Sequence, residues 1–266
     1  MRASASPTCD VQVYDDLGTA VDLPPRVRRV VSLVPSLTET VARGAPGLLV
    51  GATDWCTEPA DLDVTRVRGT KNPDIDAVLR LTPDLVLANE EENRPGDVEA
   101  LRAAGLPVWV TDVRTVPGGL GSLARVLRAC GVGRPSWLDR AEQVWREPYD
   151  GARRRGFVPV WRRPWMCLGR DTFAGDVLAR LGVDNVFADH AERYPRISLD
   201  EVRRSGVELV VLPDEPYAFT PEEGVEVFGS WGVPFVCVPG RLVTWYGPSL
   251  VEARAELSAL LEAATG

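Results

Sequence analysis

The feature of this sequence that most constrains its fold is an internal repeat. Residues 74–88 begin with Asp74-Ile75-Asp76 and continue into an apolar strand, and residues 198–212 follow the same order from Ser198-Leu199-Asp200, 124 positions later. A Gly-x-Pro turn precedes a further apolar strand at Gly105 and again at Gly232. A repeated supersecondary unit indicates two similar lobes. The alternative is that two unrelated stretches converge on a common α/β pattern.

Short apolar strands alternate with helical stretches along the chain. Strands are expected at 29–34, 48–50, 84–88 and 108–110, and helices at 74–81 and 96–104. Continuous apolar runs of this length are typical of parallel strands that are covered on both faces. The predicted fold class is α/β, with two α/β lobes whose sheets are mainly parallel, joined by a single long backbone helix.

The predicted domain boundaries follow from a break in this alternation. Residues 117–154 begin with a helical stretch to Cys130, are interrupted at 131–135, and continue from Ser136 to about Arg154 as a long charged helical segment. The whole is too long for a βαβ crossover but suits a connector between lobes. We expect an N-terminal lobe over 1–116, with a hairpin within 1–25, a connecting backbone helix over 117–154 and a C-terminal lobe over 155–266. A chain of 266 residues leaves each lobe large enough to bury a core.

The charge balance excludes one class of partner. The chain has 30 Lys and Arg against 38 Asp and Glu, which leaves a net charge of −8. It therefore lacks the basic field that attracts nucleic acid or an anionic membrane surface. We expect no nucleic-acid partner.

Catalysis and an intrinsic metal site have little support in the sequence. The single histidine, His190, has no nucleophile near it in sequence, and no Gly-x-Ser-x-Gly motif is present. Gly69-Thr70-Lys71 lacks the earlier glycine of a phosphate-binding P-loop. We expect no catalytic residue, metal ligand or intrinsic cofactor, although an α/β hydrolase or transferase that uses the acidic loops is an alternative. No Cys-x-x-Cys pair occurs, which predicts structural thiols at Cys9, Cys56, Cys130, Cys167 and Cys237.

The first residues show no targeting signal. They contain no apolar run of the length found in a signal peptide, and Cys9 does not follow such a run, so it is a poor lipid-attachment site. The chain as it stands is expected to be cytoplasmic, or periplasmic or at the cell surface if a leader has been removed.

Aromatic and cationic residues gather in polar loops that follow the expected strands. In open α/β sheets, ligands bind outside the carboxyl ends of the strands. The residues expected to bind a ligand are Trp55, Thr70, Lys71, Arg170, Tyr194, Arg241, Trp245 and Tyr246.

Each of these positions also has a structural interpretation. Trp55 or Tyr194 could cover an edge of the core. Trp245-Tyr246 could fasten the last helix to the sheet. Arg170-Asp171-Thr172 could be a helix cap with a surface ion pair.

Asp76 and Asp200 occupy equivalent places in the repeat. With Asp74 and Ser198 as N-caps, each lies in the first turn of a helix, where the helix dipole favours a carboxylate. That effect alone explains them. Alternatively, each lobe presents one acid to the paired basic sites of a two-fold symmetric partner.

Several stretches together resemble the helical-backbone, or class III, substrate-binding proteins of ABC importers, the family that includes cobalamin-binding and iron-siderophore-binding proteins. The resemblance covers about residues 26–264, and its most specific pieces are residues 29–39, 83–88, 182–187, 193–195 and 244–248. It implies two α/β lobes joined by one long helix, with a shallow ligand cleft between them.

The resemblance also implies roles for individual residues. Tyr194 and the Trp55-Cys56 turn match aromatic ligand contacts of the cobalamin binders, and Asp76 and Asp200 match acids that dock on permease arginines. Three positions depart from that pattern. Thr70 stands where the cobalamin binders have a stacking tryptophan, Trp245 where they have an arginine, and Arg241 where they have an aspartate.

The function implied by the resemblance is non-catalytic binding of a metal chelate that feeds an ABC importer. A corrinoid such as cobalamin, a ferric siderophore or haem would suit Trp and Tyr rings edged by Arg170 and Arg241. The metal would belong to the chelate, the protein partner would be an ABC permease, and we expect a monomer. A cytoplasmic chelate-binding or regulatory relative on the same fold is an alternative.

Overall fold

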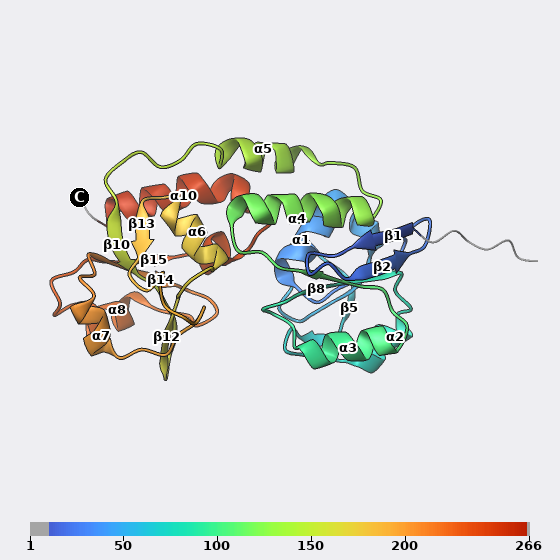
Figure 1. Cartoon of the computed structure of the whole chain (residues 1–266), viewed down its shortest axis with the longest axis horizontal. Helices are drawn as coiled ribbons and strands as arrows, with labels where there is room; N and C mark the ends of the chain where they lie inside the picture. The colour runs from blue at the N-terminus through green and yellow to red at the C-terminus, as the bar shows by residue number, and fades with distance from the viewer. Residues whose placement is uncertain (1–10, 265–266) are drawn as a thin grey trace, which may run out of the picture. The chain divides into compact units, whose positions relative to one another are not determined.

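The computed structural model describes residues 11–264, which form two compact units (Figure 1). Among these residues, unit 1 comprises 11–112 and Gly121–Ser136, and unit 2 comprises Val113–Leu120 and 137–264. Cys9 and the first part of the predicted 1–25 segment lie outside the described residues. Within 11–264, no helix is long and apolar enough to cross a bilayer.

Unit 1 is built on a five-stranded parallel sheet with strand order β5-β4-β3-β8-β9. The carboxyl ends of parallel strands share one edge of a sheet, so the loops that follow them lie together. The strands are β3 (Val30–Ser32), β4 (Leu49–Ala52), β5 (Thr65–Arg66), β8 (Leu85–Asn89) and β9 (Val108–Thr111). Between them lie α1 (Pro35–Gly44), η1 (Pro46–Leu48), the short pair β6 (Arg68–Gly69) and β7 (Asn72–Pro73), α2 (Ile75–Arg80) and α3 (Pro95–Ala103).

The helices α2 and α3 cover one face of this sheet (Figure 1). Alternate β9 residues, Val108 and Val110, pack there with Leu101 of α3 in one buried cluster. Trp109 is also buried but is not part of that cluster. This alternation follows from the two-residue period of strand side chains.

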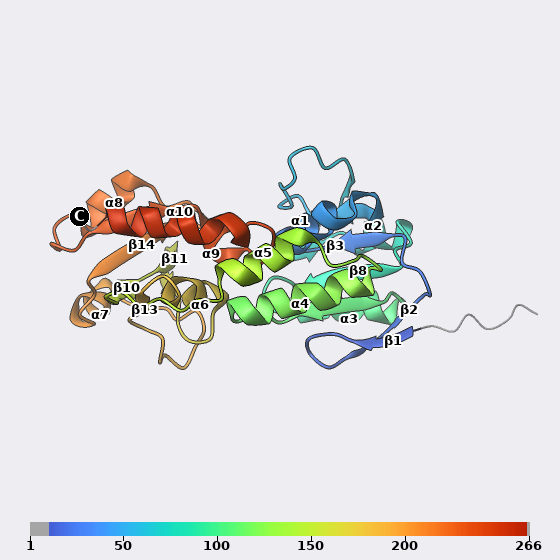
Figure 2. The same cartoon turned by 90° about the horizontal axis from the view of Figure 1, so that it is seen from above.

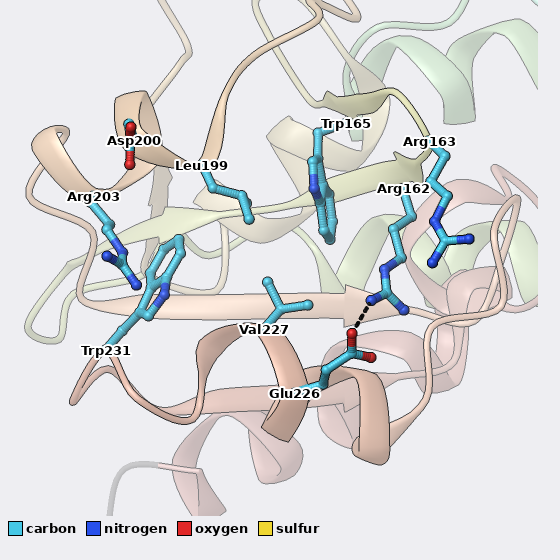
Figure 3. Close-up of a pocket in the computed structure, with 9 residues that line it drawn as sticks. All are labelled: Arg162, Arg163, Trp165, Leu199, Asp200, Arg203, Glu226, Val227 and Trp231. Carbon is cyan, nitrogen blue, oxygen red and sulfur yellow. Dashed lines mark hydrogen bonds and ion pairs between the residues drawn. The ribbon is translucent and has the colours of Figure 1, made fainter.

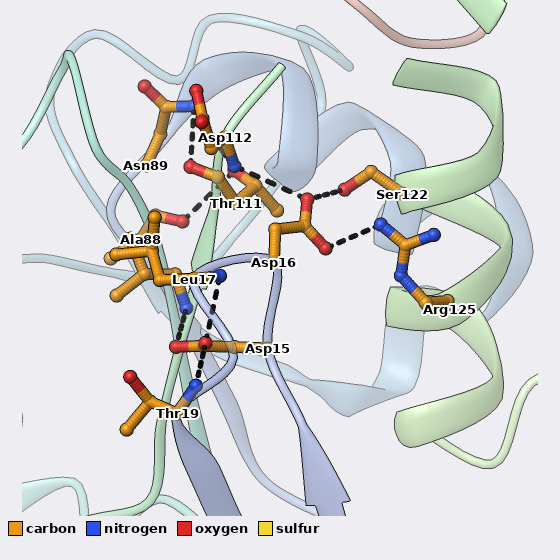
Figure 4. Close-up of polar contacts among 11 residues, drawn as sticks. Asp15, Asp16, Leu17, Thr19, Ala88, Asn89, Thr111, Asp112, Ser122 and Arg125 are labelled. Carbon is orange, nitrogen blue, oxygen red and sulfur yellow. Dashed lines mark hydrogen bonds and ion pairs between the residues drawn. The ribbon is translucent and has the colours of Figure 1, made fainter. Parts of the chain in front are cut away.

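The N-terminal hairpin, β1 (Val11–Tyr14) and β2 (Ala20–Leu23), is antiparallel as predicted. Its turn is held against β9 and the helix α4 (Val116–Ala129) by two aspartates (Figure 4). The buried Asp15 accepts hydrogen bonds from Leu17 and Thr19 backbone N–H groups. Asp16 accepts from Arg125 at 2.7 Å, and its own N–H donates to the Val110 carbonyl at 3.2 Å. The turn thereby covers part of the exposed edge of β9, which would otherwise be open to pairing.

Unit 2 has a four-stranded parallel sheet with strand order β13-β10-β14-β15. Its strands are β10 (Arg154–Phe157), β13 (Val183–Asn185), β14 (Leu209–Pro213) and β15 (Phe235–Val238). The segment before residue 168 forms an antiparallel hairpin of β11 (Pro159–Arg162) and β12 (Trp165–Cys167). Five helices that follow the hairpin belong to this unit: α6 (Phe173–Ala179), α7 (Leu199–Arg204), α8 (Pro221–Phe228), α9 (Gly240–Thr244) and α10 (Leu250–Ala263).

The internal repeat is a structural repeat. The bounds of α2 and β8 map onto those of α7 and β14 at an offset of 124 residues, and the bounds of β9 map onto those of β15 at 127. Gly105 and Gly232, in the turn before each last strand, both have positive φ, 83° and 68°, a conformation that glycine adopts without strain. The two units therefore share one folding pattern, and convergence of single stretches does not account for a match of this length.

The connector departs from the single long helix that was predicted over 117–154. It consists of α4 (Val116–Ala129) and α5 (Ser136–Val144), and its last residue, Arg154, begins β10. Gly131, with φ 70°, follows the end of α4, and Pro148 disfavours a helical conformation at the residue before it. The end of α5 is fastened to α10, where Trp145 Nε1 donates to the Leu250 carbonyl at 2.8 Å (Figure 2).

Candidate functional site

Trp55 lies in the loop that follows β4, at the carboxyl edge of the unit 1 sheet. Its side chain is 66% exposed. The indole nitrogen lies over Gly69, 3.3 Å from the position that a Cβ atom would take there. Directly after it, the buried Cys56 thiol accepts a hydrogen bond from Thr38 Oγ1 at 3.0 Å. Trp55 thus rests on a fixed loop and presents an open aromatic face, so it does not cover the core.

Thr70 and Lys71 form the turn between β6 and β7, beside Gly69. The Asn93 side chain donates to the Thr70 carbonyl at 2.9 Å, and the Lys71 ammonium donates to the Glu91 carbonyl. Asn93 is itself held because its Oδ1 accepts from the Asn89 backbone N–H at 2.8 Å. The structure therefore brings Trp55, Thr70 and Lys71 together at one sheet edge. Sequence analysis did not find the positioning role of Asn93.

Arg170 and Tyr194 come from two loops of unit 2 that pack on each other. The Gly169 N–H donates to the Arg193 carbonyl at 2.7 Å. A Cβ atom at Gly169 would lie 2.1 Å from the Glu192 carbonyl oxygen, so only glycine permits this approach. Tyr194 is half-buried and Arg170 is exposed. The two predicted ligand residues thus share one loop cluster.

The structural interpretation of the segment 170–172 is also confirmed. Thr172 caps α6, because its Oγ1 accepts from the Gly175 N–H at 3.2 Å. Arg170 and Asp171 form an exposed ion pair at 3.8 Å. Exposed pairs of this kind add little stability, so the Arg170 guanidinium can exchange this partner for an anionic ligand at small cost.

Arg241, at the start of α9, lies in a cluster of charged and aromatic side chains. Its guanidinium carbon is 5.5 Å from the Trp245 ring centroid, and it pairs with Glu252 at 3.1 Å. Glu215 lies in the same cluster and accepts a hydrogen bond from Thr244 Oγ1 at 3.2 Å. Burial raises the pKa of Glu215, the neighbouring Asp214 adds to this, and the Thr244 hydrogen bond and the Arg241 charge oppose it. The cluster therefore combines a fixed cation with a carboxyl group that retains its proton above the usual range.

Trp245 and Tyr246 are less available to a ligand than their place in a polar loop suggested. They are 8% and 4% exposed, respectively. The Tyr246 ring meets Phe173 edge to face, with 5.8 Å between centroids. The structure thus supports the packing interpretation for Tyr246, and it places Trp245 beneath the Arg241 guanidinium.

Asp76 and Asp200 lie where the repeat places them. Both are exposed and lie in the first turn of α2 and α7. Asp74 caps α2 by accepting from the Ala77 N–H at 2.9 Å, and Ser198 caps α7 within a reciprocal capping box with Glu201. In each helix, a residue other than Asp76 or Asp200 thus accepts from a first-turn backbone N–H, and both of these carboxylates are exposed.

The cysteines and the histidine fit structural roles. Cys56, Cys130, Cys167 and Cys237 are free thiols, which agrees with the prediction for these four. Burial raises the pKa values of Cys130 and Cys167 to about 12, which makes both thiols poor nucleophiles. His190 Nδ1 accepts from the Glu192 N–H at 3.0 Å within its loop. Among residues 11–264, no three His, Cys, Asp or Glu side chains are grouped to hold a metal ion.

Sequence analysis missed a groove in unit 2. It has a volume of about 490 Å³ and is formed by the β11–β12 hairpin, α7, α8 and the residues just after α8 (Figure 3). Asp200 lines it, whereas none of the predicted ligand-binding residues does. Its residues are scattered from Arg162 to Trp231, so no local motif could have identified them. The available signal was the difference between the two repeats at equivalent positions.

Known proteins resemble this chain in sequence and in fold. No family model matches the sequence. A vitamin B12-binding protein of Pectobacterium carotovorum is 24% identical over 250 residues, 89% of each chain. The crystal structure of the periplasmic vitamin B12-binding protein BtuF of Vibrio cholerae superimposes with a TM-score of 0.72 at 19% identity, covering 90% of this chain and 98% of BtuF. The periplasmic heme-binding protein RhuT of Roseiflexus sp. RS-1 gives 0.72 at 17% identity, covering 90% and 100% of the two chains.

Proposed function

We propose that this chain, a member of the class III periplasmic binding protein family, binds a metal chelate outside the cytoplasmic membrane and delivers it to an ABC importer. The protein performs no chemistry on the chelate. The similar proteins of known structure are periplasmic binding proteins for vitamin B12 and heme, which favours this location over a cytoplasmic one.

The observation that carries the proposal is the exposed Trp55 ring next to the Thr70-Lys71 turn. The Trp55 side chain is 66% exposed on a loop that the Cys56 hydrogen bond holds, so its ring can serve as a preformed aromatic binding surface. The Asn93 hydrogen bond holds the neighbouring turn, so the site needs little reorganisation when a ligand arrives.

The ligand class follows from the side chains at the two sheet edges. Trp55 and Tyr194 offer aromatic faces for a flat or bulky organic body. Lys71, Arg170 and Arg241 supply cations, and a guanidinium matches a carboxylate in geometry as well as charge. We propose a corrinoid, haem or a ferric siderophore, with acidic or polar groups at its edge and its own metal. Thr70 contributes polar contacts and Trp245 supports Arg241 from below.

Asp76 and Asp200 serve as docking acids for the permease in this proposal. Each lies at the same place on an equivalent helix, and the importer would present one cationic site to each. Their exposure and the completed caps beside them favour this role over a purely structural one.

A binding panel tests the function. Tryptophan fluorescence quenching is measured against cobalamin, cobinamide, haem and ferric siderophores. At least one chelate is expected to saturate below about 100 μM, or roughly −5.5 kcal/mol. If none of them binds in this range, the proposal is wrong. The double variant Asp76→Lys with Asp200→Lys tests docking separately from binding. It should keep its affinity for the chelate and lose its association with membranes that contain the permease.

A further inference from the structure

The groove in unit 2 has an apolar middle and arginines towards its ends (Figure 3). Leu199 and Val227 line its centre, next to Trp165. The Trp165 ring is fixed from behind, because it stacks on Phe219 with 6.0 Å between centroids. The groove floor is therefore rigid before any partner arrives.

Among the described residues, Arg163 and Arg203 of the groove have no acidic partner, whereas Arg162 pairs with two glutamates. Arg162 donates to Glu226 at 2.8 Å and also to Glu223. Arg203 lies over the Trp231 ring, with 4.8 Å from its guanidinium carbon to the centroid. No carboxylate of residues 11–264 pairs with Arg163 or Arg203. The groove thus presents two available guanidinium groups on a chain whose net charge is −8.

The side chains that form the groove are not repeated at the equivalent positions of unit 1. The repeat aligns Arg203 with Leu79 and Trp231 with Ala104, so neither partner of the stacked pair is present there. The hairpin that supplies Arg162, Arg163 and Trp165 is inserted between β10 and α6, whereas β3 in unit 1 runs directly into α1. Asp76 and Asp200 are equivalent, and Asp200 lines the groove.

We propose that this groove receives an acidic segment of the same permease on which Asp200 docks. In this segment, two carboxylate side chains flank an apolar side chain. This inference rests on the proposed function. The carboxylates pair with Arg163 and Arg203, and the apolar side chain covers Leu199 and Val227. Trp and Arg are the residues that most often dominate protein interfaces. Because the hairpin and the Arg203–Trp231 pair that form the groove belong to unit 2, the acidic segment docks on unit 2.

Photo-crosslinking tests the partner and its chemistry. The full-length protein carries p-benzoylphenylalanine at Val227 in the groove, or at Glu201 beside Asp200, and is irradiated with membranes of its own organism. Mass spectrometry of the Val227 product is expected to give a permease peptide that contains Asp or Glu. A permease peptide without acidic residues, or a second copy of this chain, would overturn the inference.

Charge reversal supplies the second arm. Arg163→Glu with Arg203→Glu should reduce the Val227 crosslink at least tenfold and leave chelate affinity unchanged. Arg140→Glu with Arg146→Glu, the same charge change on and just after α5, should alter neither. If the probe at position 201 crosslinks to the permease but the probe at position 227 does not, the groove inference is wrong and the proposed docking stands. If neither probe crosslinks to the permease while the protein still binds chelates, the proposed permease docking itself is wrong.

Discussion

The carboxylate of Asp84 accepts a hydrogen bond from the backbone N–H of Arg29 at 3.0 Å, and the Arg29 guanidinium donates to the Leu81 carbonyl at 2.7 Å. Unit 2 repeats the arrangement. Glu208 accepts from the Arg155 N–H at 2.8 Å, and Arg155 donates to the Ser205 carbonyl at 2.6 Å. In both units, the acid directly before one core strand (β8 or β14) thus fixes the start of the neighbouring strand (β3 or β10).

Neutralising these acids should destabilise the fold. Asp84→Asn or Glu208→Gln weakens a charge-assisted hydrogen bond to a backbone N–H at an exposed position, for which we expect a loss of about 1 kcal/mol in the free energy of unfolding. Urea denaturation measures it, with the exposed Glu99→Gln as the control. Equal stability of all three variants would show that the acids do not fix the strands.

The repeat made much of the fold predictable, because apolar strands and their turns recur at a constant spacing. The strand at 84–88 and the helix at 74–81 match β8 and α2 closely. The connector was harder. Its charged, helix-favouring residues predict helix from Ser136 to about Arg154, but α5 ends at Val144, and tertiary contacts such as Trp145 with Leu250 hold the irregular chain that follows.

The candidate site was predictable in its loops but not in the direction of each side chain. Trp55 and Tyr246 are both aromatic residues in segments that look like polar loops, yet Trp55 is exposed and Tyr246 packs on Phe173. The difference depends on a contact between residues far apart in sequence, which no local pattern reveals. The same holds for Arg203 and Trp231 in the groove.

Trp55→Ala should weaken chelate binding. Removing an exposed aromatic anchor is expected to cost about 1–3 kcal/mol of binding free energy. Calorimetric titration with the chelate that binds best in the fluorescence panel measures the change. Trp161→Ala, at another exposed tryptophan, should leave the affinity unchanged because Trp161 contacts Tyr217 in the hairpin region. Unaltered affinity in Trp55→Ala would remove this residue from the site.

Gly169→Ala should disturb both stability and chelate binding. The added Cβ would meet the Glu192 carbonyl at 2.1 Å, so the loop that carries Tyr194 must move. We expect a loss of about 1–3 kcal/mol in unfolding free energy, as for overpacking elsewhere, together with weaker binding. Gly96→Ala is the matched substitution, because nothing lies within 4 Å of its Cβ and it is in α3. There alanine should stabilise by about 0.5–1 kcal/mol.

Glu215→Gln should change how stability depends on pH. Burial raises the pKa of this carboxyl above 4.5, so the folded state binds the proton more tightly than the unfolded state does. Its contribution to stability is full below pH 4.5 and is lost as the pH rises through the folded pKa. The variant should therefore have a higher Tm than the parent at pH 8 but not at pH 4, by about 2–4 °C for each 1 kcal/mol gained. If the difference in Tm between the two proteins were the same at pH 4 and pH 8, it would contradict a raised pKa for Glu215.

Thr82 offers a stability test that the repeat itself suggests. It has a φ of 44°, and its equivalent 124 positions later is Gly206, with a φ of 71°. A β-branched residue is strained in this region, whereas glycine is not. We expect Thr82→Gly to raise the free energy of unfolding by about 1 kcal/mol, and Gly206→Thr to lower it by about as much or more. Urea denaturation of both variants distinguishes strain from side-chain contacts, since loss of stability in Thr82→Gly would mean that the threonine side chain contributes more than its backbone costs.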